Sequence, residues 1–145
     1  TLSKLDLPLA SSLHVRECRV LTYIKAPFVK ATYLSNCRSV MVLHFPVAEK
    51  LSLSSMDRLS RIIAPFLKEF EMERCDSIRV IDLPNASWLR VESCYSLLWV
   101  RAHRASDVAI SCCSQVEGLE FMEGIALKIH WCSRLKTLMS LPRYL

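Results

Sequence analysis

Glycine and asparagine, the residues that most readily form tight turns, are scarce in this chain. Its 145 residues include only Gly118 and Gly124 as glycines, and Asn36 and Asn85 as asparagines. A glycine-rich phosphate-binding loop is therefore excluded. Any corners of the fold must be turned by proline, serine and ordinary residues.

Long apolar runs and catalytic constellations are missing as well. No segment approaches the roughly 18 uncharged apolar residues of a membrane span, and residues 1–13 lack the layout of a signal peptide. No two histidines have metal-ligand spacing. The net charge of +5 is modest and dispersed, which does not by itself indicate nucleic-acid binding. We therefore expect no enzyme activity, metal, cofactor, membrane insertion or nucleic-acid partner.

Cysteine, by contrast, is abundant and regularly placed. Six of the seven cysteines are separated by 19 residues or by twice 19, and a methionine fills the missing place. These ladder positions are Cys18, Cys37, Met56, Cys75, Cys94, Cys113 and Cys132. A period kept without an insertion indicates a stacked repeat in which every coil buries the same position.

Apolar residues follow the same period at other places in the unit. Three residues after the ladder positions stand Leu21, Val40, Leu59, Ile78, Leu97, Val116 and Leu135. Three residues before the ladder positions stands another strict row, which consists of Val15, Leu34, Leu53, Met72, Val91, Ile110 and Ile129. The ninth place of the first five coils is Pro8, Pro27, Pro46, Pro65 and Pro84. These rows predict a single solenoid domain over residues 1–145, with about seven 19-residue coils.

Each coil contains two segments in which apolar residues alternate with others. Leu89-x-Val91 precedes a ladder position, and Ile81-x-Leu83 precedes a proline. Alternation of this kind indicates strands, and a proline at the end of a strand removes no ladder hydrogen bond there. We therefore favour parallel strands on both sides of the solenoid over a helix on its back.

The segment Ala86-x-x-Leu89-x-Val91-x-x-Cys94 resembles the highly regular part of a leucine-rich repeat, Leu-x-x-Leu-x-Leu-x-x-Asn or Cys. The resemblance covers essentially the whole chain and is closest in form to short cysteine-containing bacterial repeats. It implies a right-handed solenoid with a parallel sheet on one face, and a second strand row or extended turns on the other. It also implies that the cysteine satisfies backbone groups in the turn beneath the strand. The 19-residue unit is shorter than most repeats of that family.

The cysteines have two interpretations, a metal or redox site and a stack of reduced, buried thiols. Ladder Cα atoms in adjacent coils should lie about 5 Å apart, which is near enough for a disulfide. Their side chains point the same way, however, and Met56 cannot join a pairing scheme. We expect unbridged thiols that behave as small hydrophobes. A reducing compartment follows, such as the cytoplasm, or the host cytoplasm for a secreted effector. Cys112, off the ladder, is the cysteine we expect to be exposed.

Both ends of the chain match the repeat, and neither shows the polar cap that repeat arrays normally need. Leu2 and Leu5 already occupy apolar places of a coil whose ladder residue would precede Thr1. We therefore expect flanking repeats or domains in a longer protein.

The outward positions of the first strand vary while the buried rows stay constant. They mix charge, hydroxyl and aromatic groups, and tyrosine, tryptophan and arginine are the usual anchors of protein interfaces. The hypothesis is a protein-binding surface, within an effector, an adhesin or a substrate-recruiting factor. Its residues are Tyr33, Glu71, Glu73, Trp88, Arg90, Glu92, Lys128 and His130. The alternative for each residue is a solvated sheet face.

Two further functions stay open. A carbohydrate-active or carbohydrate-binding solenoid could use Glu71 with Glu73, or Glu73 with Glu92, as carboxylates about 5–7 Å apart. A purely structural spacer is the third alternative. The basic cluster around His103 could contact an acidic partner, but we expect it to lie on a solvated corner. On the same reasoning Glu117, Glu120 and Glu123 are expected to form a neighbouring acidic patch.

Overall fold

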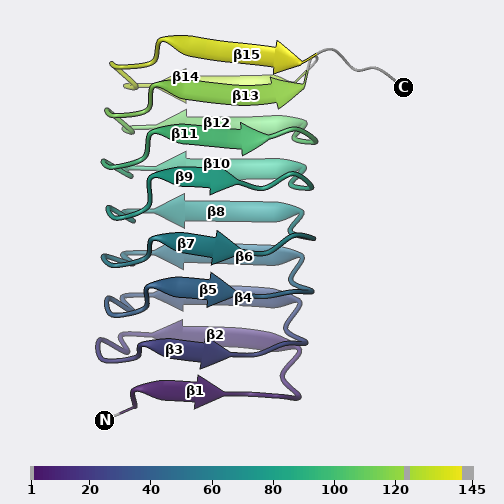
Figure 1. Ribbon diagram of the computed structural model, residues 1–145, viewed down its shortest axis with the longest axis vertical. Helices are drawn as coiled ribbons and strands as arrows, with labels where there is room; N and C mark the ends of the chain where they lie inside the picture. Colours follow the sequence, from purple (N-terminus) through teal and green to yellow (C-terminus); the bar gives the residue numbers. More distant parts are fainter. Residues whose placement is uncertain (1, 123–124, 142–145) are drawn as a thin grey trace.

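The computed structural model describes residues 2–122 and 125–141. In them the chain forms parallel strands stacked coil on coil into a β-solenoid, which rises from the N-terminus to the C-terminus in Figure 1. Equivalent residues of adjacent coils are 19 apart, as in the pairing of Trp88 with Asp107. No helix occurs in these two ranges. The predicted solenoid, with strands on both sides, is therefore confirmed.

One side of the solenoid is a continuous seven-stranded parallel sheet of five-residue strands. Its strands in chain order are β2 (Ser12–Arg16), β4 (Ala31–Ser35), β6 (Lys50–Ser54), β8 (Glu69–Glu73), β10 (Trp88–Glu92), β12 (Asp107–Ser111) and β14 (Ala126–His130). Inward and outward side chains alternate, because successive residues of a strand point to opposite faces. In β10, Leu89 and Val91 are buried and Arg90 is exposed.

The other side is divided into three separate parallel sheets. The first joins β1 (Lys4–Asp6) to β3 (Tyr23–Lys25), and the second joins β5 (Val42–His44) to β7 (Arg61–Ile63). The third contains β9 (Val80–Asp82), β11 (Trp99–Ala102), β13 (Gly118–Met122) and β15 (Thr137–Leu141). The hydrogen-bonded ladder is thus interrupted between β3 and β5 and between β7 and β9, although β8 behind the second break pairs with both β6 and β10.

The core is a continuous apolar column between the two sides. Ladder positions 37, 56, 75, 94 and 113 have no exposed surface, and the largest fully buried side chains are Phe45, Phe70 and Phe121. Burying one such side chain contributes about 1.5–3 kcal/mol relative to leaving it exposed. Each of the seven cysteines is unbridged. Cys112 is partly exposed, whereas Cys113 beside it is buried.

One corner of every coil is turned at the residue just before the ladder position. Within the described residues, the non-glycine residues with positive φ are Glu17, Asn36, Ser55, Arg74, Ser93, Cys112 and Trp131. Their φ angles lie between 51° and 56°, which is the left-handed region. In the described residues this corner is therefore made without glycine, and asparagine supplies the left-handed conformation only at position 36.

The ladder cysteine stabilises the same corner. The Cys94 thiol donates to the carbonyl oxygen of Glu92 at 3.4 Å, and the Cys113 thiol donates to that of Ser111 at 3.2 Å. The Leu97 N–H then donates to the Cys94 carbonyl oxygen at 3.3 Å, closing a four-residue turn. Thiols are weak donors, and each of these bonds adds a second donor to a carbonyl oxygen that already accepts a backbone N–H, from Arg74 at Glu92 and from Ser93 at Ser111.

The opposite corner uses proline. The Val29 N–H donates to the Ala26 carbonyl oxygen at 3.3 Å, which places Pro27 second in a four-residue turn. Proline favours this position because its φ is already near the required value. The residue after proline points to solvent, and Phe28 is 62% exposed.

Candidate interaction face of the seven-stranded sheet

The structure places all eight predicted surface residues on the outward side of the seven-stranded sheet, which we call the outer face. They alternate with buried residues in β4, β8 and β10, and with the partly buried Leu127 and Ile129 in β14. Glu71 is in register with Arg90, and Glu73 with Glu92, so five of the eight occupy two adjacent strands. Tyr33 lies two strands away on one side of this group. Lys128 and His130 lie beyond β12, which presents Ala109 and Ser111.

Arg90 is the centre of the group on β8 and β10. Its guanidinium carbon lies 5.4 Å from the centroid of the Trp88 ring, and its Nη1 lies 3.9 Å from Glu71 Oε1. A cation over an aromatic face at an exposed site contributes about 0.5–1 kcal/mol, and an exposed ion pair contributes a similar amount or less. These contacts therefore orient Arg90 and Trp88 more than they stabilise the fold.

A second aromatic group lies around Tyr33, toward the N-terminal end of the sheet. The His14 ring meets the Tyr33 ring edge-on with centroids 4.6 Å apart, and the guanidinium carbon of Arg16 lies 5.2 Å from the Tyr33 centroid. His14 and Arg16 were not among the predicted surface residues. Their places in the 19-residue unit are those of Arg90 and Glu92, so the same row could have identified them.

An open groove of about 410 Å³ connects the two aromatic groups. Tyr33 and Trp88 line it together with Lys50, Glu69 and Glu71. Lys50 Nζ is 3.0 Å from Glu69 Oε1, which sets a cation and an anion side by side on neighbouring strands. The groove therefore offers an aromatic group at each side and paired charge between them, and we call it the outer-face groove.

The buried Thr32 side chain lies beneath this groove. Its Oγ1 is enclosed and has no hydrogen-bond partner among the residues that the structure describes. In the neighbouring coils the equivalent inward positions are Leu13 and Leu51, which are apolar. A buried hydroxyl without a partner costs about 1–3 kcal/mol, so Thr32 is a weak point of the core under the outer face.

Two of the three carboxylates that the sequence offers for glycosidic chemistry, Glu71 and Glu73, are engaged by cations. Glu71 faces Arg90, and Glu73 Oε1 lies 3.2 Å from Arg74 Nε. Glu92 is in register with Glu73 on the adjacent strand. In the described part of the chain, no three histidine, cysteine, aspartate or glutamate side chains are grouped so that they could hold a metal ion.

The thiols beneath the sheet are held in the protonated form. A hydrogen bond with Cys113 lowers the pKa of Cys94, but a hydrogen bond with Cys75 and burial outweigh it and raise that pKa to about 12. A hydrogen bond with Cys94 and burial likewise raise the pKa of Cys113. Because the thiolate is the nucleophile and the metal ligand, these two cysteines are unreactive at neutral pH, which agrees with a structural role.

The residues around His103 lie away from the outer face, on the divided side. His103 Nε2 is 2.7 Å from Glu120 Oε1, and Arg101 Nε is 3.3 Å from Glu120 Oε2. The Glu120 side chain is only 16% exposed, so it forms a shared ion-pair cluster with the basic residues instead of a separate acidic patch. Glu117 lies 3.8 Å from Lys136. Glu123 lies outside the described residues.

No family model, curated protein or solved structure matches the chain. The described part of the chain also contains no helix that is long and apolar enough to span a membrane.

Proposed function

We propose that this chain is a non-enzymatic recognition module that binds another protein through the outer face. The observation that carries the proposal is the unbroken seven-stranded register, which holds Tyr33, Trp88 and Arg90 on a single surface. We also propose, from the repeat pattern, that the chain is related to leucine-rich repeats with short cysteine-containing units.

The scaffold suits recognition because it is ordered before a partner arrives. Every strand of the outer face except the two at its ends has a hydrogen-bonded neighbour on both sides. The face therefore loses little backbone freedom on binding, and this loss is one of the main terms that oppose association. Trp88 and Arg90 are also oriented by their mutual contact.

The size of the face indicates how a partner would sit on it. Seven strands cover about 29 Å across the sheet, five residues cover about 17 Å along it, and the product is about 490 Å². A standard interface buries about 800 Å² on each partner. A partner that uses the outer face therefore also contacts a corner of the solenoid or a neighbouring part of the protein.

The outer-face groove supports carbohydrate binding as the second candidate function. Tyr33 and Trp88 stand on opposite sides of it, with Glu69, Glu71 and Lys50 between them. Sugars stack on aromatic rings while their hydroxyls bond to charged groups, so a short glycan fits this lining. A glycan array that shows binding abolished by Trp88→Ala, with no protein partner, would replace the leading proposal with this one. A hydrolysis screen on the bound glycans would then test for activity.

The test of protein binding compares two tryptophan–arginine pairs on opposite sides of the molecule. Trp88→Ala with Arg90→Ala removes the pair on the outer face. Trp99→Ala with Arg101→Ala removes a similar pair on β11, where the cation lies 5.9 Å from the ring centroid.

A photoreactive residue in place of Ser52, which lines the outer-face groove, captures the partner covalently. We expect the first double variant to abolish the cross-link and the second to retain it. Equal loss in both variants, or no loss in the first, would contradict the proposal. Thermal unfolding of each variant separates lost binding from lost folding.

A further inference from the structure

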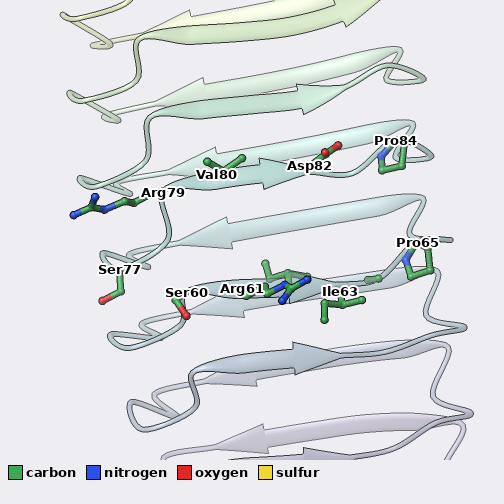
Figure 2. Close-up of a pocket in the computed structure, with 11 residues that line it drawn as sticks. Ser60, Arg61, Ile63, Pro65, Ser77, Arg79, Val80, Asp82 and Pro84 are labelled. Atoms are coloured by element: carbon green, nitrogen blue, oxygen red, sulfur yellow. The ribbon is translucent and has the colours of Figure 1, made fainter.

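The break between β7 and β9 opens the side of the solenoid opposite the outer face. A hollow of about 660 Å³ lies at this break (Figure 2). This volume lies within the range of ligand-binding sites in proteins. Residues of β7 and β9 line it, among them Arg61, Ile62, Ile63, Val80 and Asp82.

The hollow reaches the core. Ile62 is partly exposed, whereas the equivalent residues of the neighbouring coils, Leu43 and Ile81, are 0% and 2% exposed. Behind the break, β8 remains hydrogen-bonded to both β6 and β10. The two coils are thus separated on one side only, and the opening is held by an intact sheet on the other.

The facing edges of β7 and β9 carry backbone groups outside any sheet ladder. In the structure β7 pairs with β5, and β9 pairs with β11, but β7 and β9 belong to different sheets. An open strand edge is a template for another extended chain, because its N–H and C=O groups bond to the added backbone. Two such edges face each other across this hollow, which points to a peptide as the occupant.

The side chains around the hollow select the charge of that peptide. Arg61 and Arg79 line it, and neither has an ion-pair partner in the described part of the chain. Figure 2 shows Arg79 toward the end that holds Ser77, and Asp82 toward the end that holds Pro84. A guanidinium group binds a carboxylate through two parallel hydrogen bonds, so the arginines favour an acidic side chain.

Apolar groups complete the lining. Val80 is 47% exposed, and Ile63 beside the break is partly exposed. Both are β-branched, and such side chains pack well against others on a strand surface.

We propose that the hollow between β7 and β9 binds an extended peptide segment in which an acidic residue is flanked by β-branched residues. The peptide backbone bonds to the open edges of β7 and β9. Its carboxylate pairs with Arg61, which Figure 2 shows between Ser60 and Ile63, while Arg79 adds positive charge at the end that holds Ser77. Its apolar side chains contact Ile63 and Val80. This site is separate from the outer face and does not depend on the function proposed for it.

The probe is the capped peptide Thr-Val-Glu-Val-Thr, titrated into the ¹⁵N-labelled protein. We expect amide shift changes centred on residues 60–65 and 79–84, and none of comparable size in the strands of the outer face. A peptide with lysine in place of glutamate should bind at least about tenfold more weakly, because it loses a charge-assisted hydrogen bond. A peptide methylated on its backbone nitrogens should also bind more weakly, because it cannot bond to the strand edges.

Variants test whether the two arginines cause the preference for the glutamate peptide over the lysine peptide. In Arg61→Gln with Arg79→Gln, the glutamate and lysine peptides should bind equally, while Arg58→Gln, an exposed arginine outside the hollow, should keep the preference. Both lining arginines are exposed, so the double variant should retain the amide spectrum of the fold. Absence of shifts at millimolar peptide, shifts centred elsewhere, or an unchanged preference in the double variant would each overturn the proposal.

Discussion

Two adjacent serines give a prediction in which the same substitution has opposite effects. Ser55 has a φ of 53°, in the left-handed region, whereas Ser54 is the last residue of β6 and is not among the residues with positive φ. Glycine adopts the left-handed conformation without a steric penalty. We expect Ser55→Gly to stabilise the protein and Ser54→Gly to destabilise it.

The magnitudes follow from two opposing terms. A left-handed residue with a Cβ costs about 1–2 kcal/mol, and glycine costs about 0.5–1 kcal/mol through the greater freedom of the unfolded chain. Ser55→Gly should therefore raise the free energy of unfolding by about 0.5–1 kcal/mol. Ser54→Gly has only the second term and should lower it by a similar amount. For a chain of this size each kcal/mol shifts the melting temperature by about 2–4 °C.

Urea and thermal unfolding, followed by circular dichroism, measure both variants. Ser93, with a φ of 54°, occupies the same corner two coils further on. Ser93→Gly should repeat the gain, and the double variant should show the sum, because distant sites usually act independently. If Ser54→Gly and Ser55→Gly change stability in the same direction, the assignment of strain to the corner is wrong.

Three further predictions concern the core and the buried thiols. Thr32→Val replaces the unpartnered hydroxyl with a methyl of similar volume and should raise the free energy of unfolding by about 1 kcal/mol in urea titrations; a loss would show that the hydroxyl is satisfied. Phe70→Ala should cost about 3–5 kcal/mol because the ring is fully buried, whereas Phe66→Ala, at a side chain 60% exposed, should cost less than about 0.5 kcal/mol. Folding raises the pKa of the Cys94 thiol from 9.0 to about 12. As pH rises, the unfolded state therefore loses the thiol proton at a lower pH than the folded state does. The stability contributed by that group should be complete below pH 9 and fall by about 1.4 kcal/mol by pH 10. Cys94→Ala should remove this part of the pH dependence; an identical slope in both proteins would contradict it.

The coils and buried rows could be predicted because each coil repeats the same local pattern. Leu89-x-Val91 alternates as a strand does, and the 19-residue period places every such segment beside its counterpart in the next coil. The outward set followed directly, since residues between buried ones must face solvent. Membership in the leucine-rich repeat family and the interaction role of Trp88 and Arg90 stay predictions.

Other features depend on three-dimensional contacts that the 19-residue period does not predict. The left-handed corner is occupied by residues as different as Glu17, Ser55 and Trp131, so composition gave no signal for it. Glu120 meets His103 because register joins β11 to β13, while the two residues are 17 apart in sequence.

The sequence by itself determined the repeat length, the strands on both sides and the residues that fill the core, because these depend on short, regular spacings of apolar side chains. Only the tertiary structure decided where the ladder of the divided side stops. The β7 and β9 segments occupy equivalent places in adjacent coils, yet they do not pair, whereas the strands behind them do. Hydrogen bonding between coils requires backbone groups to approach within about 3 Å, and small differences in how successive coils stack decide whether they do. Because these coils pair on one side and separate on the other, the outer face is intact and the hollow lies opposite it.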